Sequence, residues 1–307
     1  MKNTIILIFF FSFSLADIHA QDTSHFTSTE IIYGRKDGMA LTLIKLSPKE
    51  KSNGKGIINV VSGNFVSSFD WVPRYIERSQ KFIDHGFTVF LVLHGSQPRY
   101  AIPDEIKDVK RAVQFVRYHA ADYGIDPKHI GITGSSAGGH LSLMVGLSDD
   151  SANADSKDPV DKVSSRVQAV AVFFPPTDFL NYGYKKLSPL QNQEVMRKQG
   201  VAAAFDFKEW NDSTKTITSI TDSTKRMQIA KEISPAYFVT SDDPPVLIIH
   251  GDADKVVPLQ QSQLIIKELQ DAKVPNQLII KPGRGHGWTG ISTDEEIFVG
   301  WFEKWLK

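Results

Sequence analysis

Short apolar runs alternate with amphipathic stretches through most of the chain. The apolar runs are nearly uninterrupted, as is typical of strands buried on both faces of a sheet, and cover residues 56–61, 87–93, 130–133, 167–174, 246–250 and 276–281. The intervening stretches have apolar residues at helical spacing and predict helices over residues 73–85, 104–123, 141–147, 260–272 and 294–307. This recurring order of strand, helix and strand favours an α/β fold, with a mostly parallel sheet and helices on both of its faces.

The beginning of this pattern is different. Residues 30–34 and 41–46 are both strand-like, and between them lies Lys36-Asp37-Gly38. An Asp-Gly pair between two such runs is typical of a hairpin turn. We therefore expect an antiparallel hairpin to open the sheet and to bring the total to eight strands.

The alternation stops between about residues 178 and 243, where the pattern predicts no clear strand. This region is rich in aromatic residues (Phe179, Tyr182, Tyr184, Phe205, Phe207 and Trp210) and contains a polar stretch over 211–225. An insertion of this length is long for a plain loop and is usually functional. We predict a cap or lid over the carboxyl edge of the sheet.

The N-terminus has the pattern of a signal peptide. Lys2 precedes a short apolar run over residues 5–15, and the small residue Ala20 ends the polar segment after it. Cleavage after Ala20 removes residues 1–20 and leaves one domain over 21–307, which we expect to be secreted or periplasmic and free of the membrane. The alternative is a membrane anchor, although the apolar run is short for a span. The sequence has no cysteine, so an exported chain has to be stable without disulfides.

Composition excludes some partners. The chain of 307 residues has 35 Lys and Arg against 35 Asp and Glu. A balanced charge argues against nucleic acid as a partner, because such binding rests on a basic surface.

One turn carries the clearest chemical signal. Gly134-Ser135-Ser136-Ala137-Gly138 lies between a predicted strand and a predicted helix and has the spacing G-x-S-x-G, with Ser136 at its centre. A nucleophile at the tip of such a turn has a strained backbone, and small neighbours let the chains pass closely. The helix that follows directs its free N–H groups toward the reaction centre. We predict that Ser136 is a nucleophile.

A serine nucleophile needs a base and an acid that orients the base. His286 lies in a glycine-rich loop after the last predicted strand, at the edge where catalytic groups collect. The acid is expected after the preceding strand, in Gly251-Asp252-Ala253-Asp254. We favour Asp254, which lies farther along the loop, over Asp252, which is better placed to brace the turn. Asp178 is a weaker third choice.

The order Ser136, Asp254, His286 is that of the α/β-hydrolase triad. The chain after the signal peptide resembles an α/β-hydrolase over nearly its whole length. It is most similar to secreted bacterial esterases related to feruloyl and acetyl-xylan esterases, with kinship to the prolyl-oligopeptidase catalytic domain. Residues 134–140, 108–132, 250–258 and 285–287 carry this resemblance. The resemblance implies Ser136 as nucleophile, His286 as base and Asp254 as acid.

The sequence departs from that family after the third strand. Where the family has His-Gly-Gly, this chain has Ser62-Gly63-Asn64-Phe65. Backbone N–H groups do not depend on side-chain identity, so we assign the oxyanion hole to the N–H groups of Asn64 and Ala137, with Gly63 or Phe65 as a further contributor. Phe65, His94 and Trp288 are candidate pocket residues. His94 ends the fourth strand and is equally consistent with a packed structural histidine.

These observations predict a secreted serine hydrolase of carboxylic esters that needs no metal or organic cofactor. Its expected substrate is a small-molecule or oligosaccharide ester, and the resemblance implies one of the carbohydrate or feruloyl type. One rival is a serine peptidase of the prolyl-oligopeptidase type. Another is a catalytically inactive hydrolase fold that serves in binding.

Overall fold

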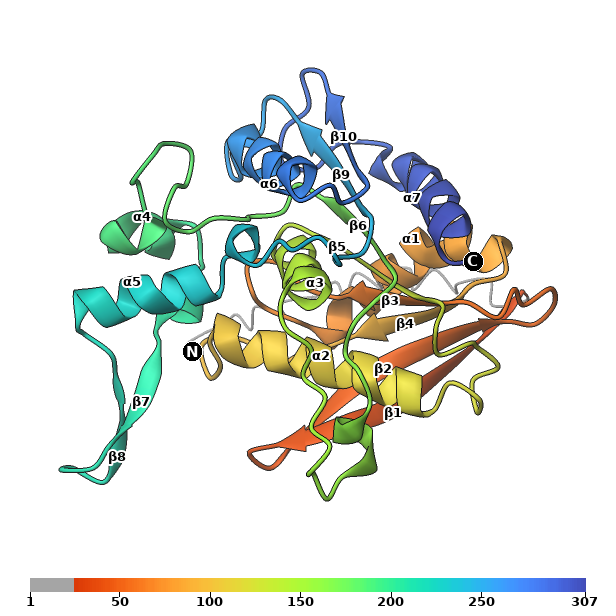
Figure 1. Ribbon diagram of the computed structural model, residues 1–307, viewed down its shortest axis with the longest axis horizontal. Coiled ribbons are helices and arrows are strands. Elements are labelled where there is room, and N and C mark those ends of the chain that lie inside the picture. Colours follow the sequence, from red (N-terminus) through yellow and green to blue (C-terminus); the bar gives the residue numbers. More distant parts are fainter. Residues whose placement is uncertain (1–24) are drawn as a thin grey trace, which may run out of the picture.

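Eight strands form one twisted sheet in the computed structural model, which describes residues 25–307 (Figure 1). Their order across the sheet is β1-β2-β4-β3-β5-β6-β9-β10. The strands are β1 (Phe26–Lys36), β2 (Met39–Pro48), β3 (Gly56–Val60), β4 (Thr88–Val92), β5 (Ile130–Ser135), β6 (Ala169–Phe173), β9 (Val246–Gly251) and β10 (Asn276–Lys281). The β1–β2 and β2–β4 pairs are antiparallel and the other pairs are parallel. All eight strands lie where the apolar pattern predicts them.

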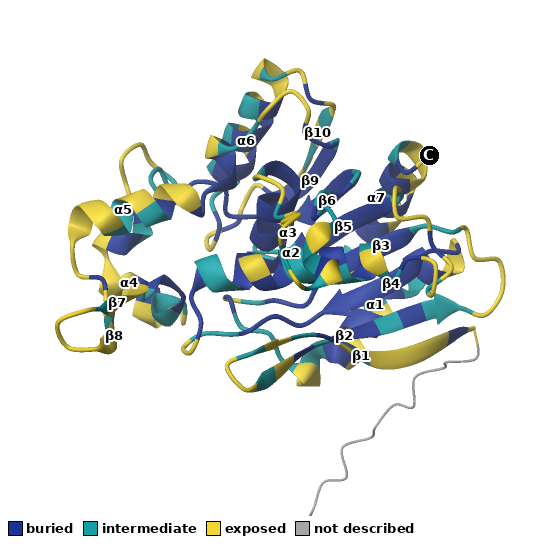
Figure 2. Cartoon of the chain, turned by 60° about the horizontal axis from the view of Figure 1, so that its bottom comes forward, coloured by how far each residue is buried: buried dark blue, intermediate teal, exposed yellow. Residues whose placement is uncertain are grey.

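Helices cover both faces of this sheet. They are α1 (Val72–Asp84), α2 (Ile102–Tyr118), α3 (Ala137–Leu147), α6 (Leu259–Asp271) and α7 (Ile291–Trp305). One core contains buried residues of α1 and α7, and the other contains those of α2, α3 and α6. Successive strand residues alternate between the two cores, as Ile57 and Ile58 do in β3, because side chains of a strand point to opposite faces. Figure 2 shows the strands as buried throughout the centre of the molecule.

The prediction for α2 extends too far at its C-terminal end. The pattern predicts residues 104–123, whereas α2 ends at Tyr118. The chain then forms turns, in which the Ile125 N–H donates to Ala120 O and Gly124 has a φ of 66°. Gly124 reaches this left-handed conformation without the steric cost that a side chain would add.

The chain between β6 and β9 forms several short elements outside the main sheet. It contains α4 (Gln193–Lys198), α5 (Ser223–Glu232) and a small hairpin of β7 (Lys208–Asn211) and β8 (Thr216–Ser219). The prediction that this region has no strand is therefore wrong. The hairpin is paired only with itself and projects from the molecule (Figure 1).

The predicted signal peptide, residues 1–20, lies outside the described residues. Between residues 25 and 307, no helix combines the length and the apolar character needed to cross a bilayer.

Candidate active site

Ser136 occupies the strained turn between β5 and α3. Its φ of 54° and ψ of −119° are rare for a residue with a side chain, and its N–H donates to Phe173 O over 3.0 Å. A Cβ on Gly134 would lie 2.4 Å from Gly138 O, so the first glycine of the motif is required by the close passage of strand and helix. The turn thus fixes the serine at the carboxyl edge of the sheet.

His286 lies between Ser136 and Asp254. Its Nε2 is 2.9 Å from Ser136 Oγ, and its Nδ1 is 2.8 Å from Asp254 Oδ2. A carboxylate only accepts, so Nδ1–H donates to Asp254 and the free Nε2 accepts the serine O–H. The three side chains meet because β5, β9 and β10 are parallel and their carboxyl ends share one edge.

Asp254 is held as a buried carboxylate. Its Oδ1 accepts the N–H groups of Val256 and Val257 over 2.8 and 2.9 Å, and its Oδ2 also lies 3.4 Å from Nε2 of the buried His250. Burial alone raises the pKa of Asp254, but the interactions with His250, His286 and the Val257 N–H outweigh it and hold the pKa below its usual value. The acid therefore remains ionised beside the imidazole.

The other two candidate acids have structural contacts. Asp252 accepts the Gly283 N–H over 2.6 Å and so braces the loop that carries His286. Asp178 accepts the N–H groups of Leu180 and Asn181 at the start of the insertion. Neither carboxylate contacts His286 in the described part of the chain, where the partner of Nδ1 is Asp254.

The chain after β3 forms a tight turn beside Ser136. The N–H of Gly63 donates to Val66 O and the N–H of Val66 donates to Gly63 O, both over 2.9 Å. Asn64 and Phe65 between them have φ of 51° and 59°, a conformation that asparagine tolerates better than most residues. Because the Gly63 N–H already has an acceptor, the assignment of Gly63 to the oxyanion hole is wrong. Within residues 25–307, the N–H groups of Asn64 and Ala137 have no hydrogen-bond acceptor.

Gln97 holds this turn, and the sequence pattern did not identify it. Its Nε2 donates to Asn64 O over 2.6 Å and to Gly200 O over 2.7 Å, while its Oε1 accepts the Ala204 N–H over 3.0 Å. Asn64 Nδ2 in turn donates to Gln199 O over 3.1 Å. The insertion is thereby connected directly to the turn beside the nucleophile.

A small apolar pocket opens on one side of Ser136. Its volume is about 50 Å³ and its lining has no charged side chain. Both Asn64 and Ala137 line it. Most of its lining residues are apolar, and four of them, from the insertion and the tight turn, are aromatic: Phe65, Phe179, Tyr182 and Phe205.

A wide cleft opens on the other side of Ser136. Its volume is about 690 Å³, and no aspartate or glutamate is among the described residues that line it. Its wall carries Trp71, Arg74, Tyr75, Arg78, His286 and Trp288. Of the three candidate pocket residues, Phe65 therefore lines the small pocket and Trp288 lines the cleft.

His94 lines neither cavity, which corrects its assignment as a pocket residue. Its side chain is fully buried, with Nδ1 2.7 Å from Gly95 O and 3.7 Å from Glu105 Oε2. Burial lowers the pKa of His94 to about 4, so the imidazole is neutral. Neither oxygen of the buried Glu105 has a hydrogen-bond partner within residues 25–307, and burial, reinforced by Asp108, raises the pKa of Glu105 to about 10.

Replacing Glu105 by glutamine is expected to stabilise the protein increasingly as pH rises from 5 to 9. The folded protein keeps Glu105 protonated up to a pKa of about 10, while the unfolded chain releases the proton above the ordinary value of 4.5. Wild-type stability therefore falls over this range by up to about 1.4 kcal/mol per pH unit, and glutamine does not titrate. Urea unfolding at pH 5, 7 and 9 measures the difference. A gain that does not change with pH, or one equal to that of the exposed control Glu232→Gln, would contradict the assignment.

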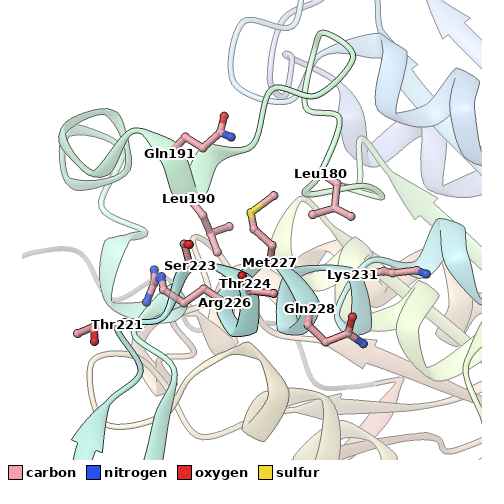
Figure 3. Close-up of a pocket in the computed structure, with 10 residues that line it drawn as sticks. All are labelled: Leu180, Leu190, Gln191, Thr221, Ser223, Thr224, Arg226, Met227, Gln228 and Lys231. Atoms are coloured by element: carbon pink, nitrogen blue, oxygen red, sulfur yellow. The ribbon is translucent and has the colours of Figure 1, made fainter.

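A further groove of about 750 Å³ lies in the insertion (Figure 3). It is lined by residues of α5 and of the segment before α4, including Leu180, Leu190 and Met227, and Ser136 is not part of it. Leu180 and Leu190 directly follow Phe179 and Pro189, which line the small pocket, so the two cavities share a wall. No cluster of three or more potential metal ligands occurs between residues 25 and 307.

The strand order and the linked serine, histidine and aspartate define an α/β-hydrolase. The chain belongs to the BD-FAE family, whose model matches residues 43–269.

Curated relatives include esterases. Esterase LipQ of Mycobacterium tuberculosis is 30% identical over 65% of this chain, and the probable carboxylic ester hydrolase LipM of the same organism is 29% identical over 60%. The matched regions cover only 42% and 38% of those two proteins.

Solved structures match over more of their length. A truncated carbohydrate esterase from gut microbiota is 28% identical, with a TM-score of 0.72, and the match covers 92% of this chain and 98% of that one. An acetyl ester-xyloside bifunctional hydrolase from Caldicellulosiruptor lactoaceticus shares the fold at 22% identity and a TM-score of 0.68, over 90% and 96% of the two chains.

Proposed function

We propose that this protein hydrolyses carboxylic esters through an acyl-enzyme on Ser136. The observation that carries the proposal is the hydrogen-bonded series from Ser136 through His286 to Asp254. Beside it lie the N–H groups of Asn64 and Ala137, for which the described part of the chain offers no acceptor. The esterase relatives and the carbohydrate esterase structure support the same reaction class.

Each group then has a defined task. Ser136 Oγ attacks the ester carbonyl while His286 Nε2 takes its proton, and Asp254 stabilises the resulting imidazolium. The N–H groups of Asn64 and Ala137 donate to the oxyanion, and each such donor supplies on the order of 3 kcal/mol of transition-state stabilisation. The imidazolium protonates the departing alcohol. Water activated by His286 then releases the carboxylic acid and restores Ser136.

We use the position of His286 to propose which cavity takes the acyl group and which takes the alcohol. The histidine has to protonate the alcohol oxygen, so the alcohol leaves on the side of His286, which lines the wide cleft and not the small pocket. The acyl group accordingly enters the small apolar pocket. Because one water-sized group needs roughly 10–15 Å³ of such space, about 50 Å³ suits an acyl chain of a few atoms, such as acetyl. A feruloyl group is far larger than this pocket.

We expect the specificity constant to fall steeply with acyl length, with p-nitrophenyl acetate preferred over the decanoate by on the order of 100-fold. A series of acetyl, butyryl, decanoyl and feruloyl esters measures this, with a dipeptide amide as the peptidase comparison. A preference for the feruloyl or decanoyl ester would contradict the acyl assignment. Faster cleavage of the amide would favour the peptidase alternative.

The secreted or periplasmic location stays a prediction that rests on residues 1–20. The mass of the mature chain, expected to begin at Gln21, tests it.

A further inference from the structure

The wide cleft has an unusual distribution of charge. Arg74 and Arg78 contribute to its wall, and the described residues that line it include no carboxylate. A cleft of one sign concentrates ligands of the opposite sign. The small pocket on the other side of Ser136 has no charged lining residue, so any preference for charge has to arise on the side of the alcohol.

The two arginines differ in whether they already form an ion pair within the protein. Arg78 is held in the wall: its Nε donates to Glu295 Oε1 over 2.6 Å and one Nη donates to Ser135 Oγ over 3.2 Å. Burial raises the pKa of Glu295 to about 7 against the opposing effect of Arg78. The guanidinium of Arg78 nevertheless already has a carboxylate partner in the wall, 2.6 Å from its Nε.

Arg74 is not engaged in this way. It lies one helical turn before Arg78 on α1, its side chain is exposed, and among residues 25–307 no carboxylate lies within ion-pair distance of it. Its guanidinium is free to bind a group that enters the cleft. A single free cation matches an anion of one charge, and the planar fork of arginine suits a carboxylate.

Two tryptophans flank the same cleft. Trp71 packs against Gly63, since its ring atoms lie 3.4 Å from where a Cβ of Gly63 would be. Trp288 packs at ring-centroid distances of 5.9 and 5.8 Å on Phe173 and Phe174, and its Nε1 donates to Asp294. One ring is therefore beside the oxyanion turn and the other beside the histidine. Both tryptophan rings are held in place and are partly exposed. The C–H side of a sugar ring can pack on such an aromatic surface.

We propose that the alcohol part of the substrate is a sugar that carries a carboxylate, a uronic acid residue, with Arg74 binding the carboxylate and the tryptophans contacting the ring. This inference rests on the proposed ester hydrolysis and on the alcohol leaving through the cleft. Acetate would be removed from an acidic sugar, and the carboxylate takes no part in bond making.

Two matched substrates test the inference: the methyl glycosides of 3-O-acetyl galacturonic acid and of 3-O-acetyl galactose, which differ only at C6, a carboxylate in the first and a hydroxymethyl group in the second. The wild-type specificity constant for acetate release is expected to be about tenfold higher for the acid than for the neutral sugar. This ratio is the effect expected of one partly exposed charge-assisted hydrogen bond. The preference should shrink as salt rises.

Arg74→Gln should bring the ratio of the two specificity constants close to one. Arg35→Gln removes an exposed arginine from β1, outside the cleft, and should leave the ratio at its wild-type value. Equal unfolding temperatures of the two variants verify that both fold. A ratio that survives in Arg74→Gln would show that Arg74 is not the partner of the carboxylate.

The remaining outcomes separate this inference from the reaction itself. If wild-type protein cleaves p-nitrophenyl acetate but treats acid and neutral sugar alike, the inference fails and the ester hydrolase stands. If a 6-O-sulfated galactose counterpart is preferred over the uronate, the choice of carboxylate is wrong. If no ester is cleaved at all, both proposals fail.

Discussion

Ser136→Ala is expected to lower kcat for every ester substrate by about 10⁵–10⁶, the loss seen when the nucleophile of a serine triad is removed. Alanine has no group that attacks the carbonyl, and the oxyanion donors and the cavities keep only a small residual rate. The fold should persist, because the hydrogen bond to His286 is the only one that the Ser136 hydroxyl forms within residues 25–307. Initial rates on p-nitrophenyl acetate, with circular dichroism of both proteins, measure the effect.

A fluorophosphonate probe gives this experiment its control. The wild type should be labelled at Ser136 and the alanine variant should not. The neighbouring Ser135 provides the matched comparison, because its Oγ accepts from Arg78 and does not contact His286. Ser135→Ala should retain the label. Equal labelling of wild type and Ser136→Ala would mean that another residue is the nucleophile.

The main sheet was predictable because its strands are buried on both faces. Burial on two sides requires an apolar residue at nearly every position, as in β3 and β6, where all five residues are buried. Such runs stand out against the amphipathic helices between them. The turn at Ser136 was predictable for a related reason: it needs small residues at fixed spacing, and a Cβ at Gly134 has no room.

The hairpin of β7 and β8 left no such signal. Its strands have four residues each, and most of these are exposed, so no buried face imposes an apolar pattern. Trp210 and Ile217 face each other across the pair and are 56% and 69% exposed. Short polar strands of this kind are indistinguishable from loop sequence.

The finer parts of the site depend on contacts between distant residues. The Gly63 N–H donates to Val66 O and is therefore not available to an oxyanion. Gln97 holds the turn by donating to Asn64 O and Gly200 O, which lie 33 and 103 residues away in the sequence. His94 follows β4 at the edge where ligands usually bind, but its buried side chain lies beside Glu105. The spacing of residues along the chain does not predict such side-chain orientations. The triad was easier to predict, because its acid and its base had to lie in the loops after β9 and β10, which offer only a few candidates.

Asp254→Asn tests the acid of that triad and is expected to lower kcat by about 10⁴. The amide oxygen can still accept the N–H groups of Val256 and Val257, which leaves the amide NH₂ facing His286. Nδ1 must then be unprotonated to accept from the NH₂, so Nε2 carries the proton and points it at Ser136. The imidazole keeps its place but no longer serves as a base, and its charged form loses its carboxylate partner.

Asp252→Asn is the matched control, two residues away in the same loop. It changes the exposed carboxylate that accepts the Gly283 N–H, a contact that an amide oxygen also provides, and kcat should change by no more than about threefold. Steady-state kinetics at pH 8 compare the two variants, and urea unfolding shows whether each keeps the wild-type fold. Similar losses in both would mean that the loop as a whole supports catalysis. A large loss in Asp252→Asn alone would move the acid to residue 252. Only a selective loss in Asp254→Asn agrees with a histidine whose tautomer is set by the carboxylate 2.8 Å from its Nδ1.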